Sequence, residues 1–193
     1  AYVGGLIQRA GLEVQALVHP PGGDAAGTRD AFIAALNDGV GFLNYQGHAA
    51  PTRLGAEGFL RNVDDYEGVE DVAALENDGR TPVMAAFTCY VGNSSFPEYE
   101  SLSQSLTLKP DGGIVAALAP FGLSLHAEAV HLNASFVRAL YGLDGWDRAE
   151  TLGRALRDAL QAHADERGDD DALASVRKTY RIQGDPALKV THP

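Results

Sequence analysis

Near-continuous apolar runs alternate with amphipathic segments along this chain, and that alternation constrains its fold more than any other feature. The runs occupy residues 40–45 (VGFLNY), 82–88 (PVMAAFT) and 113–120 (GIVAALAP). Strands have this composition when helices cover both of their faces. The sequence therefore predicts βαβ units that build an α/β fold of three layers, with a mostly parallel sheet between helices.

Amphipathic segments between these runs are predicted to form helices. In residues 28–39, Phe32, Ile33 and Leu36 share one face, and the segment stops at a glycine. A helix is expected to begin near Asp147, where Asp147 and Glu150 have the spacing of a capping box. Other helices are expected at residues 3–11, 69–75, 101–113 and 126–142.

The two ends of the chain carry weaker signals. Residues 12–18 (LEVQALV) are predicted to form a strand, and residues 177–190 a turn with short strands. Because a helix precedes the first of these strands, we expect a further strand upstream of Ala1. No repeat, low-complexity tract or second domain is visible, so residues 1–193 are interpreted as one domain that lacks its N-terminal strand or strands.

Charge and composition exclude several classes of function. The net charge of -11 disfavours a nucleic-acid partner, because a polyanion would be repelled. No apolar run reaches the ~18 residues of a membrane span, and the start of the chain shows no signal peptide. A single cysteine excludes an internal disulfide and a Cys-rich zinc site. His126 and His131 are five residues apart, which does not place two zinc ligands on one helical face.

Two reactive side chains each come just after the end of a predicted strand. His48 lies just after the run at residues 40–45, and Cys89 just after the run at 82–88. Ligands of open α/β sheets bind outside the carboxyl ends of the strands. If these two strands are neighbours, ~4.8 Å apart, the thiol and the imidazole would lie within or near hydrogen-bonding reach.

A thiol beside an imidazole favours acyl transfer. A free thiol ionises near pH 8.5, so an adjacent imidazole is needed to take its proton and later to protonate a leaving amine. Backbone N–H groups near Cys89 and after His48 would bind the developing oxyanion. The alternative is that Cys89 is a small buried apolar residue and His48 a loop residue.

Three segments resemble the gingipain-type cysteine peptidases, which belong to the caspase-like clan. They are NYQGHA (residues 44–49), AAFTCYVGN (85–93) with the GGIVAALAP that follows at 112–120, and RIQGDPALKV (181–190). The resemblance implies a caspase-like fold of flavodoxin-like, three-layer type and a cysteine endopeptidase activity on protein or peptide substrates. It also favours a secreted or cell-surface enzyme with no cofactor other than a structural calcium ion.

The same resemblance implies roles for individual residues. Cys89 would be the nucleophile and His48 the general base and acid, with the amides of Cys89 and Ala49 as the oxyanion hole. Asn44 and Tyr45 are candidates for supporting the histidine. The family usually has glycine where this chain has Ala49, and no acid matching the family's histidine-orienting residue appears in the first 47 residues.

Two alternatives remain. Those two departures motivate an inactive binding or scaffold module of the same fold. The other alternative is a caspase-clan protease that a partner protein activates. A serine α/β hydrolase is disfavoured because no Gly-x-Ser-x-Gly occurs. Asp185 is interpreted as a turn residue of the Gly-Asp-Pro sequence. The oligomeric state is not predicted, and the acids that would bind a basic substrate residue or calcium are left open among Asp64, Asp65, Glu67, Glu70, Asp71, Glu98 and Glu100.

Overall fold

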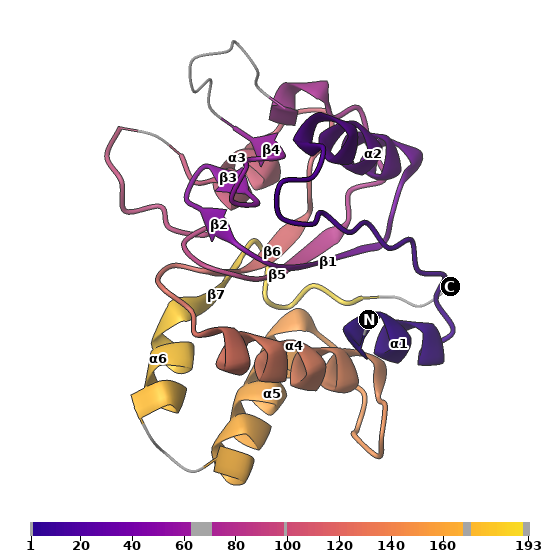
Figure 1. Cartoon of the computed structure of the whole chain (residues 1–193). Coiled ribbons are helices and arrows are strands. Elements are labelled where there is room, and N and C mark those ends of the chain that lie inside the picture. The colour runs from indigo at the N-terminus through magenta and orange to yellow at the C-terminus, as the bar shows by residue number, and fades with distance from the viewer. Residues whose placement is uncertain (1, 63–70, 99, 168–170, 191–193) are drawn as a thin grey trace.

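A four-stranded sheet lies between two layers in the computed structural model, which describes residues 2–62, 71–98, 100–167 and 171–190 (Figure 1). The strand order is β1-β5-β6-β7. The strands are β1 (Phe42–Gln46), β5 (Val83–Phe87), β6 (Ala116–Pro120) and β7 (Tyr180–Gln183). β1, β5 and β6 are parallel, and β7 is antiparallel to β6, so the prediction of a mostly parallel sheet is confirmed.

Each face of the sheet packs against a core of its own. Along β5, Val83, Ala85 and Phe87 join one core, while Met84 and Ala86 join the other. This is the alternation expected of a strand with two covered faces. The first core contains α1 (Tyr2–Arg9), α4 (His126–Tyr141), α5 (Leu152–Arg167) and α6 (Asp171–Thr179), which lie below the sheet in Figure 1.

The second face carries two α-helices, a 3-10 helix and a small sheet. They are α2 (Ala25–Asp38), α3 (Leu102–Leu108), the short 3-10 helix η1 (Asp71–Ala74), and a three-stranded antiparallel sheet of β2 (Ala49–Ala50), β3 (Arg53–Leu54) and β4 (Leu60–Arg61). The small sheet begins directly after His48 and folds back over the carboxyl end of β1 (Figure 1). The sequence did not predict this sheet, because two-residue strands have no detectable periodicity.

The helix predictions are confirmed where end signals are strong. Asp24 caps α2 by accepting a hydrogen bond from the Gly27 amide at 3.0 Å, and Gly39 follows the helix with a φ of 95°. α4 ends before Gly142, which adopts the left-handed conformation with a φ of 66°. Glycine is preferred at such a position because a side chain there would be strained.

Two sequence predictions about elements are wrong, and one helix is missing from the sequence analysis. Residues 12–18 form no strand: Leu12 and Val14 pack on the first core, but Val18 is 83% exposed. α5 begins at Leu152 rather than near Asp147, because the Thr151 hydroxyl, not the capping box, accepts from the Arg154 amide at 3.2 Å. α6 was not predicted, since the charged residues before it indicate a loop.

Candidate active site

β1 and β5 deliver His48 and Cys89 to one edge of the sheet. The two strands pair in parallel, and Gln46 lies opposite Phe87 at their carboxyl ends. His48 and Cys89 each lie two residues beyond this last matched pair. The predicted adjacency of the strands is therefore confirmed, and the two side chains leave the sheet from neighbouring, in-register strands.

Cys89 is half-buried in a bend that the loop after β6 holds in place. The Tyr90 amide donates to the Gly122 carbonyl at 3.0 Å, and the Gly92 amide donates to the Pro120 carbonyl at 2.9 Å. Gly92 is closely packed, because an added Cβ would lie 3.0 Å from the Cβ of Ala119 and 3.2 Å from the ring of Phe121. Tyr90 has a φ of 57°, a left-handed conformation that costs a non-glycine residue roughly 1–2 kcal/mol. The residue directly after the nucleophile candidate is therefore in a strained backbone conformation.

The Cys89 sulfur touches the backbone of Ser124. The Ser124 amide nitrogen lies 3.5 Å from Sγ, and the thiol contacts the Ser124 carbonyl oxygen at 3.6 Å. The Ser124 hydroxyl in turn lies 2.8 Å from the hydroxyl of Tyr180, at the start of β7. Burial raises the pKa of Tyr180 to about 12, so this phenol stays protonated near neutrality. The loop after β6 therefore contacts the sulfur through its backbone.

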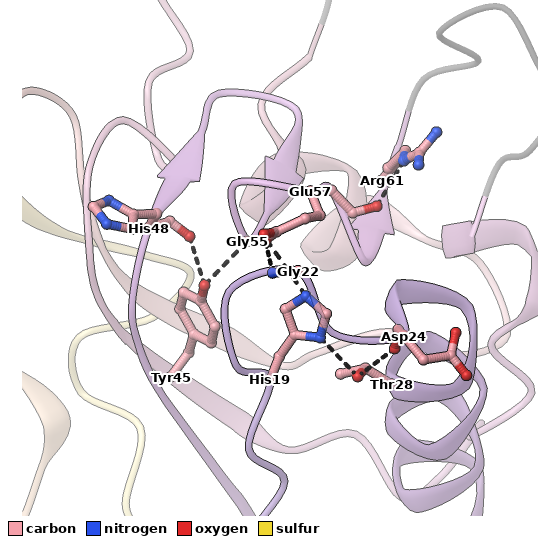
Figure 2. A network of polar contacts seen from close by, with 10 residues as sticks. His19, Gly22, Asp24, Thr28, Tyr45, His48, Gly55, Glu57 and Arg61 are labelled. Atoms are coloured by element: carbon pink, nitrogen blue, oxygen red, sulfur yellow. Dashed lines mark hydrogen bonds and ion pairs between the residues drawn. The ribbon is translucent and has the colours of Figure 1, made fainter.

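The backbone of His48 is fixed while its ring faces solvent. The His48 carbonyl accepts from the Tyr45 hydroxyl at 2.5 Å and from the Gly55 amide at 2.8 Å. Figure 2 shows the imidazole on the outer side of this network, directed away from His19. Within the described part of the chain, the His48 ring has no hydrogen bond or ion pair to a carboxylate.

The amide of Ala49 is oriented by the small sheet. Ala49 pairs with Leu54 in the antiparallel β2–β3 ladder, next to the pair in which the Gly55 amide donates to the His48 carbonyl. Hydrogen-bonded and non-hydrogen-bonded pairs alternate in such a ladder, so the Ala49 N–H points away from β3. The non-glycine residues with positive φ in the described ranges are Tyr90, Asp111 and Asp144. Ala49 is not among them, so its Cβ adds no backbone strain.

Asn44 and Tyr45, the two candidates for supporting the histidine, point to opposite faces of the sheet. Tyr45 bonds to the His48 backbone, accepts from the Gly55 amide at 3.0 Å, and has a pKa that burial raises to about 12. The Asn44 side chain exchanges two hydrogen bonds with buried Asn133 of α4, at 2.8 and 3.0 Å. Tyr45 therefore contacts the site through the backbone, whereas Asn44 joins β1 to α4.

A second polar network joins α2 to the loop between β3 and β4. The His19 Nδ1 atom lies 2.9 Å from the Thr28 hydroxyl, and its Nε2 atom lies 3.4 Å from a carboxylate oxygen of Glu57 (Figure 2). The His19 ring also lies near the Phe59 ring at a tilt of 45°, with ring centroids 5.9 Å apart. Sequence reasoning singled out neither His19 nor Glu57, because no local spacing links residues that are brought together by the small sheet.

The structure describes three of the seven acids that sequence analysis left open, namely Asp71, Glu98 and Glu100. Asp71 is buried, and its carboxylate accepts from the Arg61 amide at 2.8 Å. Glu100 accepts from the Ser105 hydroxyl at 3.2 Å, and Glu98 is exposed. The other candidates lie outside the described residues: Asp64, Asp65, Glu67 and Glu70. Asp185 accepts from the Ala187 amide at 2.8 Å, a side-chain turn of the kind predicted for it.

The two histidines of α4 lie in different surroundings. His131 contacts His163 of α5 at 3.0 Å and Glu166 at 2.7 Å, whereas His126 is exposed at the start of the helix. Among the residues the structure describes, no group of three or more His, Cys, Asp or Glu side chains is arranged to hold a metal ion. No helix in the described ranges is long and apolar enough to cross a membrane.

Comparisons with known proteins point to one family. The sequence model of Peptidase family C25 matches residues 13–191. The crystal structure of the Arg-specific cysteine proteinase gingipain R superposes with a TM-score of 0.82 at 21% identity, covering 98% of this chain and 41% of that one. The complex of the pro- and mature domains of RgpB from Porphyromonas gingivalis gives 0.78 at 20% identity, covering 98% and 42%.

A third structure, described as that of a protease, gives a TM-score of 0.68 at 17% identity and covers 81% of this chain and 37% of that one. No curated protein sequence matches the chain. These likenesses show that the fold is that of gingipain, and this chain spans about two fifths of the length of the gingipain structures it matches.

Proposed function

The chain belongs to peptidase family C25, and from that membership we propose that it is a cysteine endopeptidase that cleaves peptide bonds through Cys89 and His48. The supporting observation is the parallel, in-register pairing of β1 and β5, from which both residues emerge two positions beyond the sheet. Parallel neighbours that end together place a nucleophile and a base on one rim.

The proposed reaction has two stages. The His48 imidazole takes the proton of Cys89, and the thiolate attacks the carbonyl carbon of the scissile peptide bond. The tetrahedral intermediate collapses to a thioester as His48 protonates the leaving amine. Water, deprotonated by His48, then attacks the thioester, which releases the carboxylic acid and returns the proton to the Cys89 sulfur.

Three backbone amides suit this reaction. Within the described residues the Cys89 amide donates to no other group, and the Ala49 amide points away from its ladder, so both are available to a developing oxyanion. The Ser124 amide, 3.5 Å from the sulfur, stabilises the thiolate before attack. In this proposal the Cys89 thiol is the nucleophile, the His48 imidazole is the acid and base, and the amides bind the oxyanion, so the reaction needs no cofactor. A structural calcium ion is expected to change only the thermal unfolding temperature, measured with calcium and with EDTA.

Hydrolysis of a mixed peptide library is the direct test. The wild-type chain is expected to release peptide products, and Cys89→Ala and His48→Ala to release none above background. Iodoacetamide should label Cys89 of the wild type at neutral pH and label it more slowly in His48→Ala, because the base is absent. Equal turnover by the three proteins would remove the assignment.

A scaffold function is the second candidate, and one observation favours it. No carboxylate in the described ranges orients the exposed His48 ring. An inactive module would show no peptide cleavage and no selective alkylation of Cys89. A protease that needs a partner protein would instead show selective alkylation without cleavage until that partner is added.

A further inference from the structure

The loop that joins β6 to α4 exposes two leucines beside the candidate nucleophile. Leu123 is 67% exposed and Leu125 is 62% exposed. A lone exposed leucine is ordinary on a protein surface. These two flank Ser124, the residue whose backbone contacts the Cys89 sulfur, and so their position relates them to the site.

The orientation of Ser124 determines where its neighbours project. Its side chain turns inward, because its hydroxyl lies 2.8 Å from the hydroxyl of Tyr180, which is 2% exposed. Leu125 has extended backbone angles, with φ of -70° and ψ of 133°. Along extended backbone, successive side chains project to opposite sides. Leu123 and Leu125 therefore project away from Tyr180 and toward solvent, on either side of the sulfur contact.

The carboxylate of Glu128, which borders this loop, is directed into the protein interior. Glu128, in the first turn of α4, lines the same shallow depression as Leu123 and Leu125. It is only 6% exposed, and its carboxylate lies 2.7 Å from the Nε2 atom of buried His163. A buried carboxylate paired in this way does not turn outward to a substrate cation without leaving the histidine uncompensated. The exposed side chains that flank Ser124 in this loop are thus the two leucines, and Ser175, Val176 and Thr179 of α6 line the other side of the depression.

We propose that Leu123 and Leu125 form the contact surface for the substrate side chain next to the scissile bond, and that this chain prefers an apolar residue there. The proposal rests on the proposed peptidase function. An acyl group on the Cys89 sulfur lies against Ser124, within one residue of both leucines. Covering them removes apolar surface from water, which favours leucine-like substrate residues over charged ones.

The opposite preference is the rival outcome. The net charge of -11 and the exposed Glu98 after the nucleophile favour a basic substrate residue, and the similar gingipain R is described as Arg specific. Leucyl and arginyl substrates that differ only at the residue before the scissile bond separate the two preferences. Glu98→Gln serves as the matched variant for the acidic alternative.

The test uses two readouts on the wild type, Leu123→Ser, Leu125→Ser and the double variant. The first is kcat/KM for fluorogenic peptides with leucine, methionine, arginine or glutamate before the cleaved bond. The second is the rate at which leucyl and arginyl chloromethyl ketones alkylate Cys89, followed by mass spectrometry. Leu108→Ser is the matched control, because Leu108 is 61% exposed at the end of α3, outside the β6–α4 loop.

We expect the wild type to favour leucyl over arginyl compounds at least tenfold in both readouts, since one pocket contact of this size discriminates by about 10–200-fold. The double serine variant should lose about tenfold on leucyl compounds alone, while Leu108→Ser and the rate with iodoacetamide stay unchanged. Three results would overturn the proposal. The wild type could react faster with arginyl than with leucyl compounds, or with neither ketone. The double serine variant could also lose the same factor on all compounds. Leucine-selective alkylation without peptide cleavage would instead overturn the proposed hydrolysis and leave the binding surface standing.

Discussion

The Tyr45 hydroxyl donates a hydrogen bond to the backbone carbonyl of His48 across a distance of 2.5 Å. The same hydroxyl accepts from the Gly55 amide at 3.0 Å, so one phenol ties the end of β1 to the turn after β3. An exposed histidine that lacks an orienting carboxylate in the described residues depends on such backbone contacts for its position.

Replacing Tyr45 with phenylalanine should therefore reduce both stability and rate. Tyr45→Phe keeps the ring contact with Phe59, whose centroid is 6.0 Å away, but loses both hydrogen bonds. We expect about 1–2 kcal/mol lower unfolding free energy in urea and a several-fold lower kcat. An unchanged kcat alongside the lower stability would show that Tyr45 only supports the fold.

Ala49→Gly tests whether the methyl group at this position limits the reaction. The extended conformation of Ala49 means that glycine relieves no strain, so kcat should stay within about twofold while stability falls by roughly 0.5–1 kcal/mol. Peptide hydrolysis and urea unfolding measure the two effects. A rise in kcat of tenfold or more would show that the Ala49 side chain obstructs the site.

The edge of the sheet that carries His48 and Cys89 could be predicted from the sequence, because it follows from the apolar runs that precede these two residues. The apolar runs before His48 and Cys89 predict two buried strands, and parallel topology then places both residues on one rim. The contacts around them could not be predicted in this way. Ser124 meets Tyr180 only because β7 returns antiparallel to β6, across a separation of 56 residues. Residues 12–18 show why alternation alone is insufficient: Leu12 and Val14 pack on the core, but the structure assigns residues 12–18 no strand pairing.

Asn44→Ala should destabilise the fold without a matching loss of catalysis. It leaves the Oδ1 atom of Asn133, which is 0% exposed, without the Asn44 donor, while the Asn133 Nδ2 atom keeps its second acceptor, Gln46 Oε1, at 3.2 Å. A buried amide deprived of its partner costs about 1–3 kcal/mol, measured by urea unfolding. Because the two side chains act as a pair, Asn44→Ala with Asn133→Ala should cost less than the sum of the single variants. A loss of kcat much larger than the loss of stability would restore a supporting role for Asn44.

Stability should fall as pH rises from about 10 toward 12, because burial raises the pKa of Tyr45 and of Tyr180 to about 12. In the unfolded chain these phenols ionise near 10, so above that pH the unfolded state releases protons that the folded state retains. The stabilisation is complete below pH 10 and is lost through this window. Urea midpoints between pH 9 and 11.5, with phenolate absorbance at 295 nm, measure it. Tyr180→Phe should flatten the decline, and an equally steep decline in that variant would contradict the assignment.

Two carboxylates that contact histidines at the same distance should differ sharply in their contribution to stability. Glu128 lies 2.7 Å from His163 with its side chain 8% exposed, and Glu166 lies 2.7 Å from His131 with its side chain 59% exposed. Removing the charge of a buried pair leaves its partner uncompensated, whereas water replaces an exposed one. Glu128→Gln should lower the unfolding free energy by about 1–3 kcal/mol, and Glu166→Gln by less than about 0.5 kcal/mol. Thermal unfolding at pH 7 compares the two matched variants directly, and equal shifts in Tm would mean that burial does not set the strength of this α4–α5 contact.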